Sequence, residues 1–193
     1  MNVISQMITQ QLSGACSQQI AARLGVSEST ANTAVQIAVP LILSALARNA
    51  SQPGGAQELH QAVANDHDGS ILDNLIGYLG NPQQANGAGI LGHALGDQRG
   101  TVENNLAQAT GLNQSSAGNL MEMVAPMVMG ALGRTQQQNG FDSSGLANYL
   151  GEQQQQQAAA APGVMGMLSS MLDSNKDGSA TDDLARIAGS FFK

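Results

Sequence analysis

The chain has few aromatic and few charged residues. Of its 193 residues, 3% are aromatic, none is Trp and 11% are charged, whereas 42% are hydrophobic. A core with so few aromatic side chains must come from Leu, Ile, Val, Ala and Met. Such cores are typical of packed helices, in which Met fills irregular gaps. The composition therefore predicts an all-α protein, and the length suits one substantial domain or two small intertwined ones.

Cationic side chains are especially scarce. The 7 Lys and Arg stand singly along the chain against 14 Asp and Glu, which gives a formal net charge of −7. A protein that neutralises phosphates presents clustered Lys and Arg. No such cluster occurs here, so the charge pattern disfavours nucleic acid as a partner.

Cysteine and targeting signals are also scarce. Cys16 is the only cysteine, so no intramolecular disulfide can form. The first residues carry no basic side chain ahead of their apolar positions, which argues against a secretory signal. The longest apolar run, 37–47, is too short to span a bilayer and contains Pro40. We expect a cytoplasmic protein without a membrane span.

Signatures of catalysis are missing as well. The sequence contains no phosphate-binding loop, dinucleotide fingerprint or nucleophile elbow. Its histidines, His60, His67 and His93, have no evident convergent partners along the chain. We therefore expect a protein that is not an enzyme.

One long helical stretch occurs twice. GVSESTANTAVQIAVPLILSALAR, from Gly25, aligns without gaps on GLNQSSAGNLMEMVAPMVMGALGR, from Gly111. The identical pairs are Gly25/Gly111, Ser29/Ser115, Ala31/Ala117, Pro40/Pro126, Ala45/Ala131, Leu46/Leu132 and Arg48/Arg134. The alignment predicts two copies of one helical unit. Each has an apolar central helix that is kinked or broken at its proline.

The predicted architecture is a multihelical bundle made of five segments. These are a first unit (1–80), a connecting segment (81–97), a second unit (98–150), a Gln/Ala-rich spacer (151–163) and a C-terminal helix–loop–helix (164–193). Gln and Ala favour helix, so the spacer can be helical or flexible until Pro162 and Gly163 end it.

The C-terminal segment contains the first half of a calcium-binding loop, DSNKDGSATDDL. Oxygen-bearing side chains alternate along it, and Gly178 allows the sharp turn that follows them. The bidentate Glu expected at the twelfth position is replaced by Leu184, which predicts a weaker or more hydrated site. The predicted calcium ligands are Asp173, Asn175, Asp177, the backbone carbonyl of Ser179, and Asp182 or Asp183.

A shorter copy of this loop, NDHDGSILDNL, lies upstream in residues 64–75. Ala64 stands where the first ligand would be, which leaves Asp66, Asp68 and Asp73. Helix capping is the alternative explanation, because Ser70 and Asp73 have the spacing of a capping box, as Ser179 and Asp182 do in the C-terminal loop. We interpret the upstream copy as a turn and cap. Capping does not account for the alternating oxygens of the C-terminal loop.

Residues 18–35, QQIAARLGVSESTANTAV, resemble the helix-turn-helix of bacterial regulators. Gly25 would form the turn and Ser27 would cap the second helix. That helix carries Glu28 and no Lys or Arg before Arg48, whereas base edges and phosphates are contacted mainly by basic side chains. A DNA-binding regulator is the alternative function, and a structural corner of the bundle is the favoured interpretation.

Four stretches together resemble a known bacterial family. They are VAPMVMGALGR, NDHDGSILDNLIGYLG, GAGILGHALGDQRGTVENNLAQATGL and LDSNKDGSATDDL. The chain is similar to the YidB-like group, the domain of unknown function nine hundred thirty-seven, over nearly its whole length. The resemblance implies an all-helical fold and no assigned activity.

These observations predict a non-enzymatic interaction or scaffold protein with a calcium-binding C-terminal loop. Its partner would be another protein. Apolar faces left over after folding would also favour a homo-oligomer.

Calcium should stabilise the full chain, and Asp177→Ala should abolish that stabilisation. An ion that binds only the folded state raises the melting temperature, and the substitution removes the fifth-position ligand. Thermal melts with excess calcium and with a chelator measure the shift. A calcium-dependent shift that survives Asp177→Ala contradicts the assignment.

Overall fold

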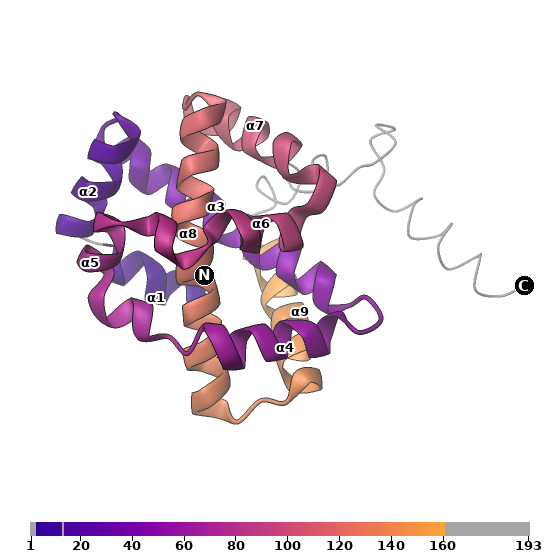
Figure 1. Ribbon diagram of the computed structural model, residues 1–193. Coiled ribbons are helices and arrows are strands. Elements are labelled where there is room, and N and C mark those ends of the chain that lie inside the picture. Colours follow the sequence, from indigo (N-terminus) through magenta and orange to yellow (C-terminus); the bar gives the residue numbers. More distant parts are fainter. Residues whose placement is uncertain (1–2, 13, 161–193) are drawn as a thin grey trace, which may run out of the picture.

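The computed structural model describes residues 3–12 and 14–160, and these form helices without any strand (Figure 1). The prediction of an all-α fold is confirmed for them. The α-helices are α1 (Val3–Gln11), α2 (Ala15–Leu24), α3 (Glu28–Ala50), α4 (Gly55–Asp66), α5 (Leu75–Gly80), α6 (Gly87–Leu95), α7 (Arg99–Thr110), α8 (Gln114–Asn139) and α9 (Ser143–Ala160). The short 3₁₀ helices are η1 (Ser70–Asn74), η2 (Pro82–Ala85) and η3 (Gly96–Gln98).

The long helices α3 and α8 pack against each other at the centre, and the shorter helices surround them (Figure 1). Every residue from Met123 to Gly133 in α8 is buried, and so is every residue from Leu41 to Ala47 in α3. Helices that are apolar on most faces belong in the interior, because no face favours water. These two helices therefore form the middle of the core.

The sequence predicts a kink or a break at each proline. Both central helices continue through it, at Pro40 in α3 and Pro126 in α8, so neither helix is broken there. Pro126 removes the N–H group that would bond to the carbonyl of Glu122. Gly87 of α6 lies against this carbonyl, since a Cβ on Gly87 would stand 1.9 Å from the oxygen. The C–H groups of Gly87 thus face an oxygen that lacks its helical donor, as in a weak C–H···O contact.

Two corners of the fold have the same construction. The α2–α3 turn passes through Gly25, at φ 69°, and the α7–α8 turn through Gly111, at φ 74°. Ser27 and Asn113 then cap the long helices, each accepting a hydrogen bond from the backbone N–H three residues on, at 3.1 and 2.8 Å. The turn and cap predicted at residues 18–35 are therefore present, and the same local chemistry recurs before α8.

The Gln/Ala-rich spacer continues a helix as far as the described residues extend. Helix α9 runs through Gly151 to Ala160, so Gly151 does not end a helix. The strong helix propensities of Gln and Ala agree with this result. The predicted calcium loop, 173–184, lies in 161–193, which are outside the described residues.

Among the described helices, α3 is long and apolar enough to cross a membrane by length and composition alone. In the structure, 67% of its most apolar stretch is buried against the rest of the protein. The central helix of a core meets the same criterion, so the property follows from its position in the bundle.

Gly133→Ala should destabilise the protein by roughly 1–3 kcal/mol, the usual cost of overpacking a core. A Cβ at this position would lie 1.7 Å from the carbonyl oxygen of His67, which is backbone and cannot rotate away. Gly92→Ala is the matched control, because no atom lies within 4 Å of its added Cβ. It should leave stability unchanged or raise it by about 0.4–1 kcal/mol. Chemical denaturation measures both, and equal effects would contradict the close packing.

Candidate functional site

A surface groove runs between α4 and the loop that follows it on one side and α6 on the other. It consists of two cavities of about 880 Å³ and about 490 Å³. Asp66, His67, Asn86 and Ile90 line both cavities, which makes them one continuous feature. We call it the α4–α6 groove. Its walls are α4, residues 66–71, α5, η2 and α6.

The floor of the α4–α6 groove is apolar and its rim is polar. Half-buried Ile71, Tyr78 and Ile90 line the larger part. The smaller part reaches down to buried core residues, among them Leu59 and Met129. Exposed amides and carboxylates stand around this floor: Glu58, Asp66, Asp68, Asn74, Asn81, Gln84 and Asn86. An apolar base with a few polar groups around it is the usual composition of a binding site.

Arg134 of α8 anchors the loop that forms one end of the groove. Its Nη2 donates to the carbonyl of Gly69, at 3.0 Å, and to Oδ1 of Asp73, at 2.6 Å. Gly69 has φ 92°, a conformation that favours glycine. The loop therefore turns at Gly69 and is held there by an arginine of the central helix.

Two glycines of α8 let this loop approach the helix backbone. A Cβ on Gly133 would lie 1.7 Å from the His67 carbonyl oxygen, and one on Gly130 would lie 2.6 Å from Cγ2 of Ile71. Larger residues on α8 would push the loop outward and lift Ile71 from the groove floor. The glycines thus set the depth of the groove at this end.

The N-termini of α5 and α6 face the groove through their caps. The Asn74 side chain accepts from the backbone N–H of Gly77, at 3.0 Å, and the Asn86 side chain accepts from that of Gly89, at 3.3 Å. Asn86 is the one non-glycine residue with positive φ in the described part of the chain. Asn tolerates this conformation because its short side chain bonds locally.

Tyr78 ties α5 to the core. Its hydroxyl donates to the carbonyl of Met123 in α8, at 2.8 Å. Burial raises the pKa of Tyr78, so the hydroxyl stays protonated. Its ring therefore has a fixed position in the groove floor.

The upstream copy of the calcium loop forms the α4 end of the groove, and its carboxylates do not gather around a point. Oδ1 of Asp68 accepts from the backbone N–H of Ser70, at 2.9 Å, and Asp73 pairs with Arg134. The predicted capping pair of Ser70 and Asp73 is wrong, because Gly69 occupies the N-cap position and Asp68 supplies the acceptor. Within 3–12 and 14–160, no group of three His, Cys, Asp or Glu side chains could hold a metal ion.

Two titrating groups of this loop are shifted in pKa. Hydrogen bonds from Ser70 lower the pKa of Asp68, which keeps it ionised at neutral pH. Burial lowers the pKa of His67, and the neighbouring carboxylates of Asp66 and Asp68 partly oppose this effect. His67 is therefore neutral near pH 7 while Asp68 is anionic.

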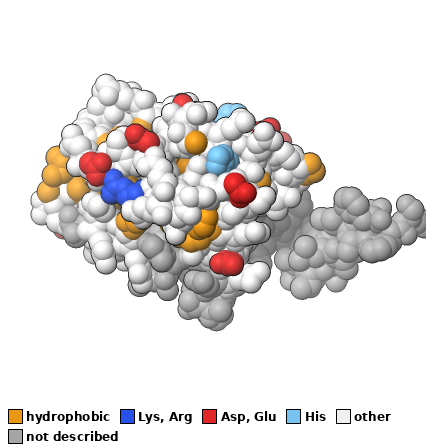
Figure 2. Space-filling model, turned by 90° about the horizontal axis from the view of Figure 1, so that it is seen from below, with side chains coloured by type: hydrophobic (Ala, Val, Ile, Leu, Met, Phe, Trp, Pro, Cys, Tyr) orange, Lys and Arg blue, Asp and Glu red, His pale blue; other side chains and the backbone are white. Residues whose placement is uncertain are grey.

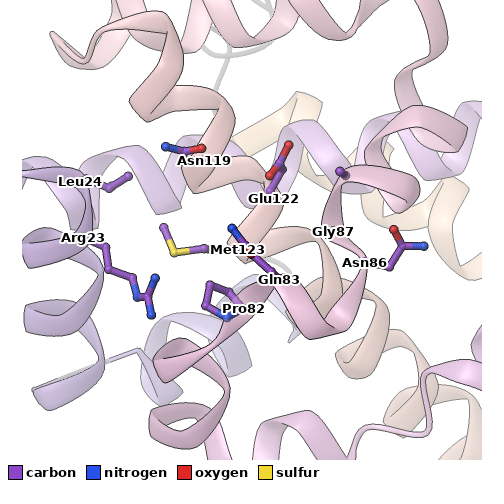
Figure 3. A pocket seen from close by; sticks show the side chains of 10 residues that line it. Arg23, Leu24, Pro82, Gln83, Asn86, Gly87, Asn119, Glu122 and Met123 are labelled. Carbon is purple, nitrogen blue, oxygen red and sulfur yellow. The ribbon is translucent and has the colours of Figure 1, made fainter.

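A further cavity, of about 410 Å³, lies where α2, η2, α6 and α8 meet (Figure 3). Arg23 and Glu122 stand on opposite sides of Met123 in it, so its two charged side chains do not face each other (Figure 3). Arg23 donates to the carbonyl of Gly80, and Glu122 pairs with Arg99. Because both charges have internal partners, this cavity offers less to a ligand than the groove does.

Every cationic side chain in the described part of the chain donates to an acceptor within the protein. The pairs are Arg23 with Gly80, Arg48 with Gln98, Arg99 with Ala88, Glu103 and Glu122, and Arg134 with Gly69 and Asp73. Seen from the side of α4, the surface is mostly uncharged, and it shows a single small blue patch (Figure 2). This surface lacks the basic stripe on which phosphate binding depends.

The described nucleophile and histidine candidates do not form a catalytic set. Cys16 is buried, and burial raises the pKa of its thiol, which keeps it protonated and inert. Nε2 of His60 is hydrogen-bonded to the carbonyl of Phe141, at 3.1 Å. His93 is exposed at the far wall of the groove.

The described residues form an all-helical protein with a polar-rimmed surface groove. A family model described as "Bacterial protein of unknown function (DUF937)" matches residues 6–135. The chain belongs to this family. Comparison with curated proteins finds no match, and comparison with solved structures finds none either.

Of the residues that line the groove, Asp66, Asp68, His67 and His93 are recognisable in the sequence as polar candidates, whereas its apolar floor is not. Residues 81–97, the predicted connecting segment, contain η2 and α6. Two local signals could have located the walls, since Asn74 and Asn86 each stand three residues before a glycine whose N–H they cap. The way α8 brings these walls together has no signal in local sequence.

Stability should fall as pH decreases below about 6.5, the ordinary pKa of histidine, and His67→Asn should reduce this fall. The folded state lowers the pKa of His67, so protonation favours the unfolded state, and the loss grows until pH passes the folded-state pKa. Urea unfolding between pH 7.5 and pH 5 measures it. His93→Asn, at an exposed histidine of the same groove, is the control and should keep the full dependence. An unchanged pH profile in His67→Asn would contradict the role of His67.

Proposed function

We propose that this protein is a non-enzymatic interaction protein that holds a segment of a protein partner in the α4–α6 groove. The observation that carries the proposal is the continuous apolar floor of Ile71, Tyr78 and Ile90 beneath a polar rim. The larger part of the groove, at about 880 Å³, is already near the upper end of small-molecule pockets, ~300–1,000 Å³. A polypeptide segment therefore fits a groove of this volume better than a compact metabolite does.

Residues that face the groove also favour docking over chemistry. The amides of Asn81 and Gln84 can both donate and accept hydrogen bonds, and they are exposed beside the floor. Backbone groups of a bound segment need such partners when they lose water. A non-enzymatic role accounts for an amide-rich wall more simply than a reaction does.

We further propose that the body consists of two copies of one helical unit. In this proposal α1, α3 and α4 of the first copy correspond to α6, α8 and α9 of the second. Support comes from reciprocal packing: α1 and α4 contact the central helix α8, and α6 and α9 contact the central helix α3. The matching glycine turns and caps before α3 and α8 add to it. In this proposal each copy buries its central helix against the other.

Calcium binding by the C-terminal loop is part of the proposal and rests on the sequence pattern. Its ligands would be Asp173, Asn175, Asp177, the Ser179 carbonyl, and Asp182 or Asp183. Self-association stays a proposal too. Among the described residues, Ile76, at 57% exposed, is the large hydrophobic side chain that is exposed. One such side chain does not make an apolar face, so the groove offers a partner more apolar contact than the rest of the described surface does.

Photo-cross-linking in the native host tests the docking role. A photoreactive residue replacing Asn81 or Gln84, both exposed in the groove wall, should cross-link one partner protein at a defined segment. The same residue at Ile76, which is exposed on α5 but does not line the groove, should not. Mass spectrometry identifies the linked segment. Equal products from the groove and from Ile76, or none from the groove, would contradict the proposal.

A further inference from the structure

Asp and Glu side chains line the α4–α6 groove, and no described Lys or Arg stands among them. Glu58, Asp66 and Asp68 all contribute to its rim. No Lys or Arg lines either part of it within the described residues. Each of these carboxylates is exposed, and none of the ion pairs found in the described chain involves them.

Partial charges of helix ends do not reverse this sign. The N-termini of α5 and α6, at Asn74 and Asn86, bring positive partial charge to the groove, and the C-terminus of α4, at His67, brings negative partial charge. Each end is equivalent to about half an elementary charge. Three full carboxylate charges outweigh their difference, and His67 is neutral near pH 7 because burial lowers its pKa.

The carboxylates are spread along the groove. Glu58 and Asp66 lie on α4 eight residues apart by number, which at 1.5 Å per residue is about 12 Å along the helix axis. Asp66 belongs to both parts of the groove, Glu58 to the smaller part and Asp68 to the larger. The negative charge therefore follows the direction of the floor.

We propose that the occupant of the α4–α6 groove is a basic amphipathic segment of a protein partner. This inference rests on the proposed docking function and specifies the chemistry of the partner. Apolar side chains of the segment lie on Ile71, Tyr78 and Ile90, and its Lys or Arg side chains face Glu58, Asp66 and Asp68. In a helical segment, the cations that meet Glu58 and Asp66 stand about seven or eight residues apart.

Peptide binding to the full-length protein tests the charge of the occupant. The probe is a fluorescein-labelled helix of Leu, Ala and Gln, about 16 residues and so about 24 Å long, with two Lys placed seven apart. Matched peptides carry Gln or Glu in place of both Lys. Fluorescence anisotropy should show the Lys peptide binding most tightly and the Glu peptide least, with a difference that shrinks as salt rises. Equal affinity for the Lys and Glu peptides, or no binding of the Lys peptide, would overturn the inference.

A paired set of variants separates the groove from the net negative charge of the chain. Glu58→Gln combined with Asp66→Asn should weaken binding of the Lys peptide by about 2- to 30-fold, the range for two exposed charge pairs. Glu28→Gln combined with Glu152→Gln removes two exposed carboxylates that do not line the groove and should change affinity little. Equal weakening by both pairs would show that overall charge alone attracts the peptide.

Ile90→Gln tests the floor independently. Ile90 is half-buried in both parts of the groove, so the change should weaken the Lys and Gln peptides alike, with the helical circular dichroism signal retained as a check of folding. Unchanged binding would place the peptide outside the groove. A neutral or acidic segment found by cross-linking would overturn this inference and leave the docking function intact. The absence of any groove-specific cross-link would contradict the docking function itself.

Discussion

Both walls of the groove depend on close backbone approaches to one buried helix, α8. At one wall, Gly133 of α8 lies against the carbonyl of His67, and at the other, Gly87 of α6 lies against the carbonyl of Glu122. Neither contact leaves room for a Cβ atom. Because α8 is buried on all sides from Met123 to Gly133, it cannot shift to accommodate one. The distance between the walls, and so the shape of the groove, follows from glycine at these points.

Proline has a related role in the same helix. Pro126 leaves the Glu122 carbonyl without its donor, and that carbonyl is where the N-terminal end of α6 packs. A buried acceptor without any partner destabilises the folded state. The C–H groups of Gly87 reduce this destabilisation by facing the oxygen. In α3, by contrast, Pro40 frees the carbonyl of Gln36, a residue exposed to water. Similar prolines in the two central helices therefore have different surroundings.

The small number of charged residues determines where the surface carries unpaired charge. The few arginines of the described chain hold elements in place: Arg134 secures the loop after α4, Arg99 joins α7 to α8, and Arg48 reaches η3. Their guanidinium groups therefore all donate to acceptors within the protein. The carboxylates of Glu58, Asp66 and Asp68 remain exposed in the groove. In the proposed function, an acidic groove on a body with few charged residues makes the surface selective for a cationic segment.

Local chemistry allowed the all-α class and the α2–α3 corner to be predicted. Gly25 and Ser27 act within a few residues of themselves, through a left-handed turn and a cap, and such effects can be recognised in sequence. The cap at Ser70 was misplaced because Asp68 and Gly69 offered a competing turn. Helix α6 was missed because its start depends on Asn86 in a positive-φ conformation, which Asn adopts only in some contexts. The residues of the groove come from several elements between α3 and α8, and their meeting is a property of long-range packing.

The sequence by itself determined the helical class, the apolar centre around Pro40 and Pro126, the scarcity of cations and the family to which the chain belongs. Each of these follows from composition, periodicity or order along the chain. Only the tertiary structure decided that the loop after α4 and the start of α6 would face each other across an acidic groove. The shape of this groove depends on the glycines of α8, against which other backbone segments pack closely. The sequence shows where these glycines are, but it does not show which backbone will pack against them.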